Sequence, residues 1–146
     1  MGKGVHDGRK TAQDVLKWLQ NVRKCDELID AKIAEREQIW ALATKITPVL
    51  SDMPKGSGVS DTIANAVVKL NTLAEEINAL VDYYVDYKAE VVATLEKLPS
   101  KEFGVLHRHY VQYMTWEDIA RDMNYSPYHI WRIKNNAIEL LIDVIE

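Results

Sequence analysis

The residues with the strongest capacity for specific hydrogen bonding lie near the C-terminus of the sequence, on one side of a predicted helix. A helix turns by about 100° per residue, so Tyr128, Arg132 and Asn135 point in one direction, flanked by His129 and Trp131. An arginine guanidinium presents several donors in a planar fork, and an asparagine amide presents a donor beside an acceptor. These side chains suit the recognition of a flat edge that carries hydrogen-bonding groups.

The residues before this helix have the spacing of a helix-turn-helix. Ala120 supplies a small residue where a first helix would meet a second. Asn124 tolerates the left-handed backbone of a tight turn, and Ile130 and Ile133 hold the second helix down. The same spacing would also fit a plain three-helix bundle without a role in DNA binding.

Two capping signals mark where these helices begin. Thr115 opens the capping-box sequence Thr-Trp-Glu-Asp, and Ser126 precedes Pro127 as N-cap and first helical residue. We expect one helix to end at Met123 and the next to run toward the end of the chain, preceded by a helix over 100–113. The last helix would bury Ile130, Ile133, Ala137, Leu140 and Leu141.

Two longer helices are predicted upstream. Over 61–98 an apolar residue recurs every seven positions, and residues 11–46 carry a matching but looser stripe. We expect an antiparallel helical hairpin over 11–98 with a turn at 51–60, after a flexible N-terminus at 1–10. The stripes could instead form the seam of a dimer. The repeating positions of the second stripe are Ile63, Leu70, Ile77, Tyr84, Val91 and Leu98.

The fold class that follows is all-α: a long N-terminal hairpin, then a C-terminal three-helix bundle over 99–146 that contains the helix-turn-helix. The chain has 146 residues, of which 47% are hydrophobic and 27% charged, with a net charge of −4. A chain of this length can bury a core without disulfides. We read the hairpin as an oligomerisation or partner-binding element, because Trp40, Tyr84 and Tyr87 exceed what two helices can cover.

Composition and motifs exclude several kinds of protein. The N-terminal residues contain no apolar stretch like that of a signal peptide, and the single Cys25 fits a reducing cytoplasm, so we expect a cytoplasmic location. No long apolar run predicts a membrane span. His107 and His109 would diverge on a helix, and no catalytic set of residues is evident. We therefore expect a non-enzymatic protein with no metal and no cofactor.

Residues 98–110, 114–120 and 125–133 together resemble region 4 of sigma-70-type factors. They are more similar still to phage late transcription regulators of the ArpU and RinA kind, in which a helical N-terminal part precedes a sigma-like helix-turn-helix. The similarity covers roughly residues 50–142. Two departures are Gly104, where a basic residue is usual, and Asn124, where a turn glycine is usual.

The resemblance implies a phage-type regulator that binds double-stranded DNA in the cytoplasm of a bacterial host. Arg132 would read guanine, Asn135 would pair with adenine or hold a phosphate, and Tyr128 and Trp131 would contact thymine methyl groups or sugars. Packing against the N-terminal helices is the alternative for Trp131. The candidate DNA-binding residues are Thr115, Trp116, Ser126, Tyr128, His129, Trp131, Arg132 and Asn135.

Charge limits this interpretation. Residues 103–135 hold four Lys or Arg against three Asp or Glu, a net of +1, and phosphate neutralisation supplies most non-specific affinity. We therefore expect a homodimer, or delivery to DNA by host RNA polymerase. Two other functions remain open: a phage adaptor or inhibitor that binds host proteins, and a small terminase subunit, which would form a ring.

Overall fold

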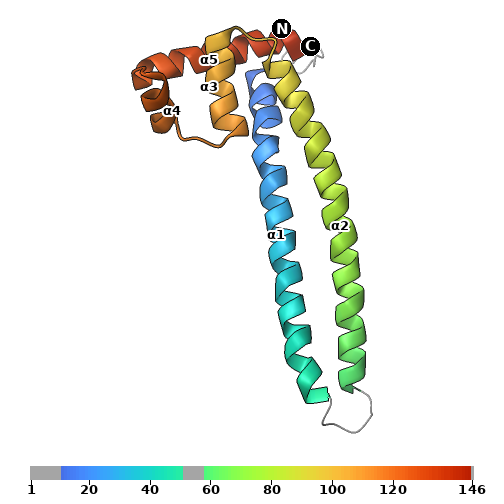
Figure 1. Ribbon diagram of the computed structural model, residues 1–146. Coiled ribbons are helices and arrows are strands. Elements are labelled where there is room, and N and C mark those ends of the chain that lie inside the picture. The colour runs from blue at the N-terminus through green and yellow to red at the C-terminus, as the bar shows by residue number, and fades with distance from the viewer. Residues whose placement is uncertain (1–10, 51–57, 146) are drawn as a thin grey trace. The chain divides into compact units, whose positions relative to one another are not determined.

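The computed structural model describes residues 11–50 and 58–145, and every regular element in these ranges is a helix (Figure 1). The predicted all-α class, with a long helical hairpin followed by a helix-turn-helix bundle, is confirmed. The expected flexible N-terminus at 1–10 and most of the expected turn at 51–60 lie outside the described residues. The elements are α1 (Ala12–Leu50), α2 (Gly58–Leu95), α3 (Ser100–Leu106), the π-helical turn η1 (His107–Val111), α4 (Trp116–Met123) and α5 (Pro127–Ile145).

The chain divides into two compact units, one of residues 25–84 and the other of residues up to 24 together with 85–146. In the first unit α1 and α2 run antiparallel (Figure 1), and Lys32 Nζ lies 3.1 Å from Glu76 Oε1. The buried apolar side chains described in this unit are those of Cys25, Ile29 and Leu73.

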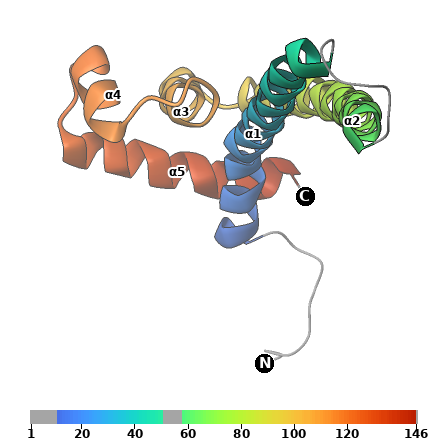
Figure 2. The same cartoon turned by 90° about the horizontal axis from the view of Figure 1, so that it is seen from below.

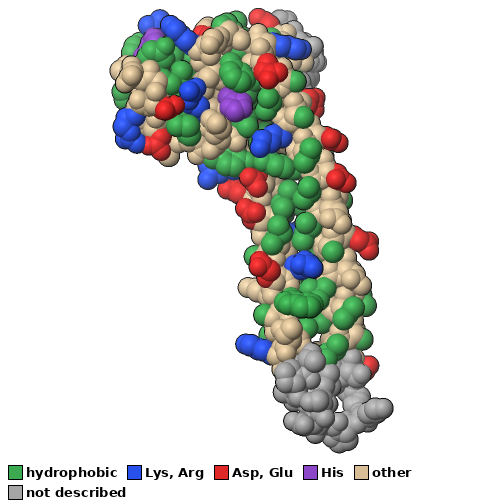
Figure 3. Space-filling model, viewed as in Figure 1, with side chains coloured by type: hydrophobic (Ala, Val, Ile, Leu, Met, Phe, Trp, Pro, Cys, Tyr) green, Lys and Arg blue, Asp and Glu red, His purple; other side chains and the backbone are tan. Residues whose placement is uncertain are grey.

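Several large apolar side chains in this unit stay exposed, and Figure 3 shows hydrophobic side chains along the visible face of the long helices. Trp40 is 60% exposed and Leu42 is 58% exposed. Tyr84 is half-buried, so it adds less exposed aromatic surface than the sequence suggested.

The second unit holds the main core. The first turns of α1 and the last turns of α2 are joined by a hydrogen bond of 2.6 Å from the Tyr87 hydroxyl to the Trp18 carbonyl. Tyr87 is therefore half-buried, and its hydroxyl is hydrogen-bonded within its own unit. α3 and α4 lie on the same side of α5 and both pack against it (Figure 2). The buried side chains contributed by α1 and α2 are Val15, Leu19, Val22, Val91 and Leu95.

The helix expected over 100–113 is divided in the structure. α3 ends at Leu106 and continues as η1, in which Gln112 N donates to His107 O at 3.0 Å. Tyr113 then takes a positive φ of 62°. Among the described helices, none combines the length and the apolar character that a membrane span needs.

Candidate nucleic-acid interface

The predicted helix-turn-helix is formed by α4, a short turn and α5, and local hydrogen bonds fix its geometry. Thr115 Oγ1 accepts from Asp118 N at 3.1 Å, and Ser126 Oγ accepts from His129 N at 3.1 Å. Asn124 has φ 59° and ψ 42°, the left-handed conformation. The two caps and the left-handed turn residue are therefore confirmed.

A buried cluster holds α5 against α3 and α4. It contains Val105 of α3, Ile119 and Ala120 of α4, and Ile130 and Ile133 of α5. Further along α5, Ala137, Ile138 and Leu141 are buried, whereas Leu140, expected in the core, is only half-buried. The buried side of α5 therefore includes Ile138 in place of Leu140, so it is turned slightly from the side that the sequence predicted.

The opposite side of α5 is open along its N-terminal half. Tyr128 is 66% exposed and Trp131 is 55% exposed, so more than half of each side chain is open to solvent. The two rings stack on each other, with centroids 5.8 Å apart. Arg132 is exposed and Asn135 is half-buried.

The cations of this region differ in how far they are neutralised. Arg108 Nε lies 2.9 Å from Asp122 Oδ2, and Arg121 pairs with Asp118 on α4. Arg132 makes no hydrogen bond or ion pair with any described residue. Arg132 of α5 is therefore available to an anionic ligand, whereas Arg108 and Arg121 are already paired.

A slot of about 200 Å³ lies on the α4 side of α5. Trp116 and Trp131 line it together with Pro127 and Ile130, and Lys134 contributes its only charge. The Lys134 ammonium lies 5.5 Å from the centroid of the Trp116 ring. The slot brings together two of the predicted residues, Trp116 and Trp131.

His109 supports Trp116 from η1. The two rings stack with centroids 3.7 Å apart and an interplanar angle of 16°. His109 Nδ1 lies 2.7 Å from Met114 O, so this nitrogen carries the proton and donates. Burial lowers the pKa of His109 below 6.5, and the charges of Arg23 and Lys134 lower it further, against the effect of the Met114 hydrogen bond.

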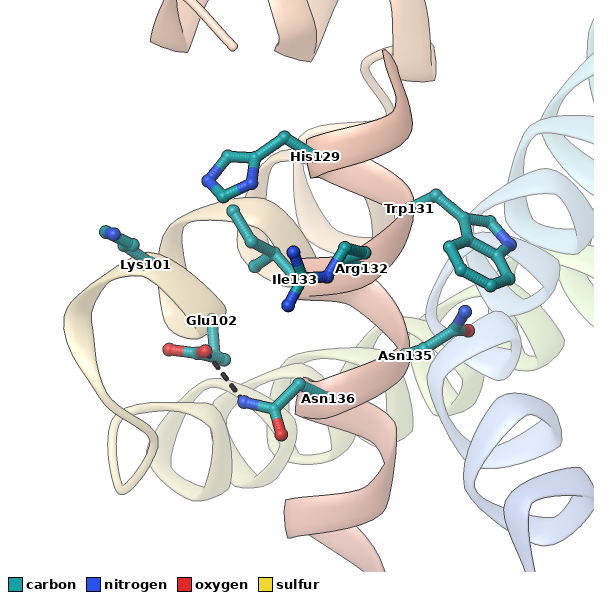
Figure 4. A pocket seen from close by; sticks show the side chains of 8 residues that line it. All are labelled: Lys101, Glu102, His129, Trp131, Arg132, Ile133, Asn135 and Asn136. Carbon is teal, nitrogen blue, oxygen red and sulfur yellow. Dashed lines mark hydrogen bonds between the residues drawn. The ribbon is translucent and has the colours of Figure 1, made fainter. Parts of the chain in front are cut away.

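A larger hollow of about 430 Å³ lies between the start of α3 and α5. Figure 4 shows His129 and Asn136 extending toward α3, with Trp131 and Asn135 on the other side of α5 and Arg132 between them. The residues that line the hollow are Lys101, Glu102, His129, Trp131, Arg132, Ile133, Asn135 and Asn136.

The predicted residues thus have two kinds of surroundings. Thr115 and Ser126 are exposed, but their hydroxyl oxygens accept from backbone amides as helix caps. The other six candidates line the slot, the hollow or the exposed side of α5. Lys101 and Glu102 were missed, because no local pattern relates these residues to a helix that begins at Pro127.

The described residues contain no group of three or more His, Cys, Asp or Glu side chains placed to hold a metal ion. Comparison of the chain with protein-family models, with curated proteins and with solved structures gives no significant match. The functional assignment therefore depends on the geometry of α4 and α5 and on the sequence resemblance.

Proposed function

We propose that this protein is a phage-type transcriptional regulator that binds double-stranded DNA in a sequence-specific manner through α5. The observation that carries the proposal is the state of Arg132: exposed, without a partner among the described residues, and on the helix that a helix-turn-helix places in the major groove. A free guanidinium there can donate two hydrogen bonds to guanine O6 and N7.

The remainder of α5 supports this assignment. Its N-terminal half is exposed at Tyr128 and Trp131, and its buried residues Ile130 and Ile133 fix it against the bundle. A rigid helix with one open side at its N-terminal end is what groove entry requires. Asn135, one turn beyond Trp131, is the second candidate for a base or phosphate contact.

Self-association is part of the proposal, because few cations face the DNA. In unit 25–84, Ile33 and Trp40 of α1 and Val67 and Val81 of α2 are exposed, and each lies four residues after a heptad position of its helix. These heptad positions are the buried Ile29, the half-buried Ile63 and Ile77, and the exposed Arg36. The shared spacing puts the four exposed residues on the same flank of the antiparallel seam. We call these four residues the Trp40 face. The other flank contains the Lys32–Glu76 ion pair. A second copy would cover the apolar flank and supply a second α5.

The proposal is tested by selecting duplexes from a random-sequence pool with the full-length protein. Enrichment of a shared sequence that contains an invariant guanine supports it, since one bidentate contact is worth about 1–3 kcal/mol of discrimination. A pool that stays random after repeated selection, at low salt, contradicts it. The alternative route, delivery by host RNA polymerase, predicts enrichment only when the polymerase is added.

A second candidate function is binding of a host protein, as an adaptor or inhibitor. The stacked and exposed Tyr128–Trp131 pair beside Arg132 favours it, because Tyr, Trp and Arg are the residues enriched in interface hot spots. Its distinguishing result is capture of one host protein by the wild type but not by Trp131→Ala, with no duplex enriched. A small terminase subunit would instead have the mass of a ring in solution.

A further inference from the structure

The hollow between the start of α3 and α5 contains more donors than acceptors. Lys101, His129, Arg132 and the amide of Asn136 can all donate, and Glu102 is the only carboxylate among the lining residues. One oxygen of that carboxylate, Oε2, already accepts from Asn136 Nδ2 at 2.9 Å. The two fixed positive charges outnumber the one negative charge, so the hollow favours an anion.

Tyr125 positions two of these donors. The Lys101 ammonium lies 6.0 Å from the centroid of the Tyr125 ring, and the His129 ring meets the same ring edge-on at 4.5 Å. A cation over an aromatic ring is held there by the ring's negative face. Lys101 of α3 therefore lies beside Tyr125, in the turn that precedes α5, and His129 of α5 contacts the same ring.

We infer that this hollow binds a phosphodiester group of the DNA backbone, with Lys101 as the main contact and Glu102 as a charge that weakens it. The inference rests on the proposed function. A helix in the major groove has a sugar–phosphate backbone on either side, and phosphate contacts fix its register. Arg132 itself lines the hollow from α5, so a duplex that places a base at Arg132 brings its backbone to Lys101 on the α3 side.

The experiment uses the full-length protein and a labelled random-sequence duplex, because phosphate contacts do not depend on base sequence. Binding is measured by fluorescence anisotropy at several salt concentrations. Lys101→Gln should weaken binding and lower the slope of log K against log [salt] by roughly 0.9, the value for one phosphate. Lys97→Gln, which removes an exposed lysine outside the hollow, should leave the slope nearly unchanged.

The second variant has the opposite expected effect. Glu102→Gln keeps an oxygen to accept from Asn136 and removes the negative charge, so it should tighten duplex binding several-fold at low salt. Glu96→Gln is the matched control, since it removes an exposed carboxylate that does not line the hollow. Thermal melting checks that all four variants are folded.

The outcomes separate the inference from the proposed function. If the wild type binds no duplex even at low salt, the proposed function is wrong. If it binds, but Lys101→Gln keeps the wild-type slope or Glu102→Gln matches Glu96→Gln, the inference is overturned and the function stands. If Lys101→Gln abolishes binding to a labelled polyglutamate peptide and leaves duplex binding unchanged, the hollow belongs to an acidic protein partner instead.

Discussion

Gly104 and Arg108 lie one helical turn apart, and the missing side chain of the first gives room to the guanidinium of the second. A Cβ at position 104 would lie 2.9 Å from Arg108 Nη1, which donates to Gly104 O at 3.2 Å. From this position Arg108 Nε reaches Asp122 of α4. The glycine where sigma-like sequences carry a basic residue thus allows Arg108 to tie η1 to α4.

This relationship predicts a measurable coupling between the two residues. In an Arg108→Ala background, Gly104→Ala should stabilise the protein by about 1 kcal/mol through helix propensity. In the wild-type background the new Cβ displaces the guanidinium, so loss of the half-exposed Arg108–Asp122 pair should cancel about 0.5–1 kcal/mol of that gain. Urea denaturation of the four proteins measures the coupling. Equal effects of Gly104→Ala in both backgrounds would contradict it.

Asn124 should be replaceable by glycine but not by alanine. Its φ of 59° costs an ordinary L-residue roughly 1–2 kcal/mol, whereas glycine adopts it freely. We expect Asn124→Ala to lower the free energy of unfolding by about 1 kcal/mol and Asn124→Gly to leave it unchanged or slightly higher. The difference between the two urea midpoints is the measurement. Equal stabilities would mean that the turn can relax.

His109 should make stability depend on pH in the acidic range. Its pKa is held below 6.5 by burial and by Arg23 and Lys134, so the unfolded chain binds a proton at higher pH than the folded one. Its contribution is therefore complete above about pH 6.5 and is lost as the pH falls through the folded pKa. His109→Phe should flatten this dependence in urea titrations. An NMR titration that gives a pKa of 6.5 or higher for the wild-type ring would contradict the account.

The Trp40 face should control the mass of the protein in solution. We expect light scattering on the full chain to give twice the 16.7 kDa chain mass and Trp40→Lys to return it to the monomer mass. Leu42→Lys is a close control, because Leu42 is as exposed as Trp40, two residues further along α1 and on another side of it. A wild-type monomer at high concentration, or equal loss of the dimer in both variants, would argue against this face.

The features that could be predicted from sequence are those set by neighbouring residues. The caps at Thr115 and Ser126 and the left-handed Asn124 depend on interactions within a few positions, and each is present. Helical periodicity likewise gave the buried side of α5 through Ile130 and Ile133.

The features that could not be predicted depend on contacts between distant residues. A helical wheel gives the direction of Trp131 from its own helix axis but not what covers it, so only the three-dimensional structure decided its exposure. The pairing of Arg108 with Asp122 and the approach of Lys101 to α5 bring together residues 14 or more positions apart. The π-helical turn at 107–111 has no signal in the periodicity.

One titration measures whether α5 reads DNA through Arg132. Wild type and Arg132→Ala are titrated with the best duplex from the random pool and with copies in which each guanine is replaced in turn. Arg132→Ala should lose about 1–3 kcal/mol on the best duplex and become indifferent to one guanine, with an unchanged circular dichroism spectrum. Lys134→Gln should instead weaken all duplexes about equally and lower the salt slope by roughly one. If Arg132→Ala keeps the wild-type affinity and the wild-type preference at every guanine, α5 is not the recognition helix.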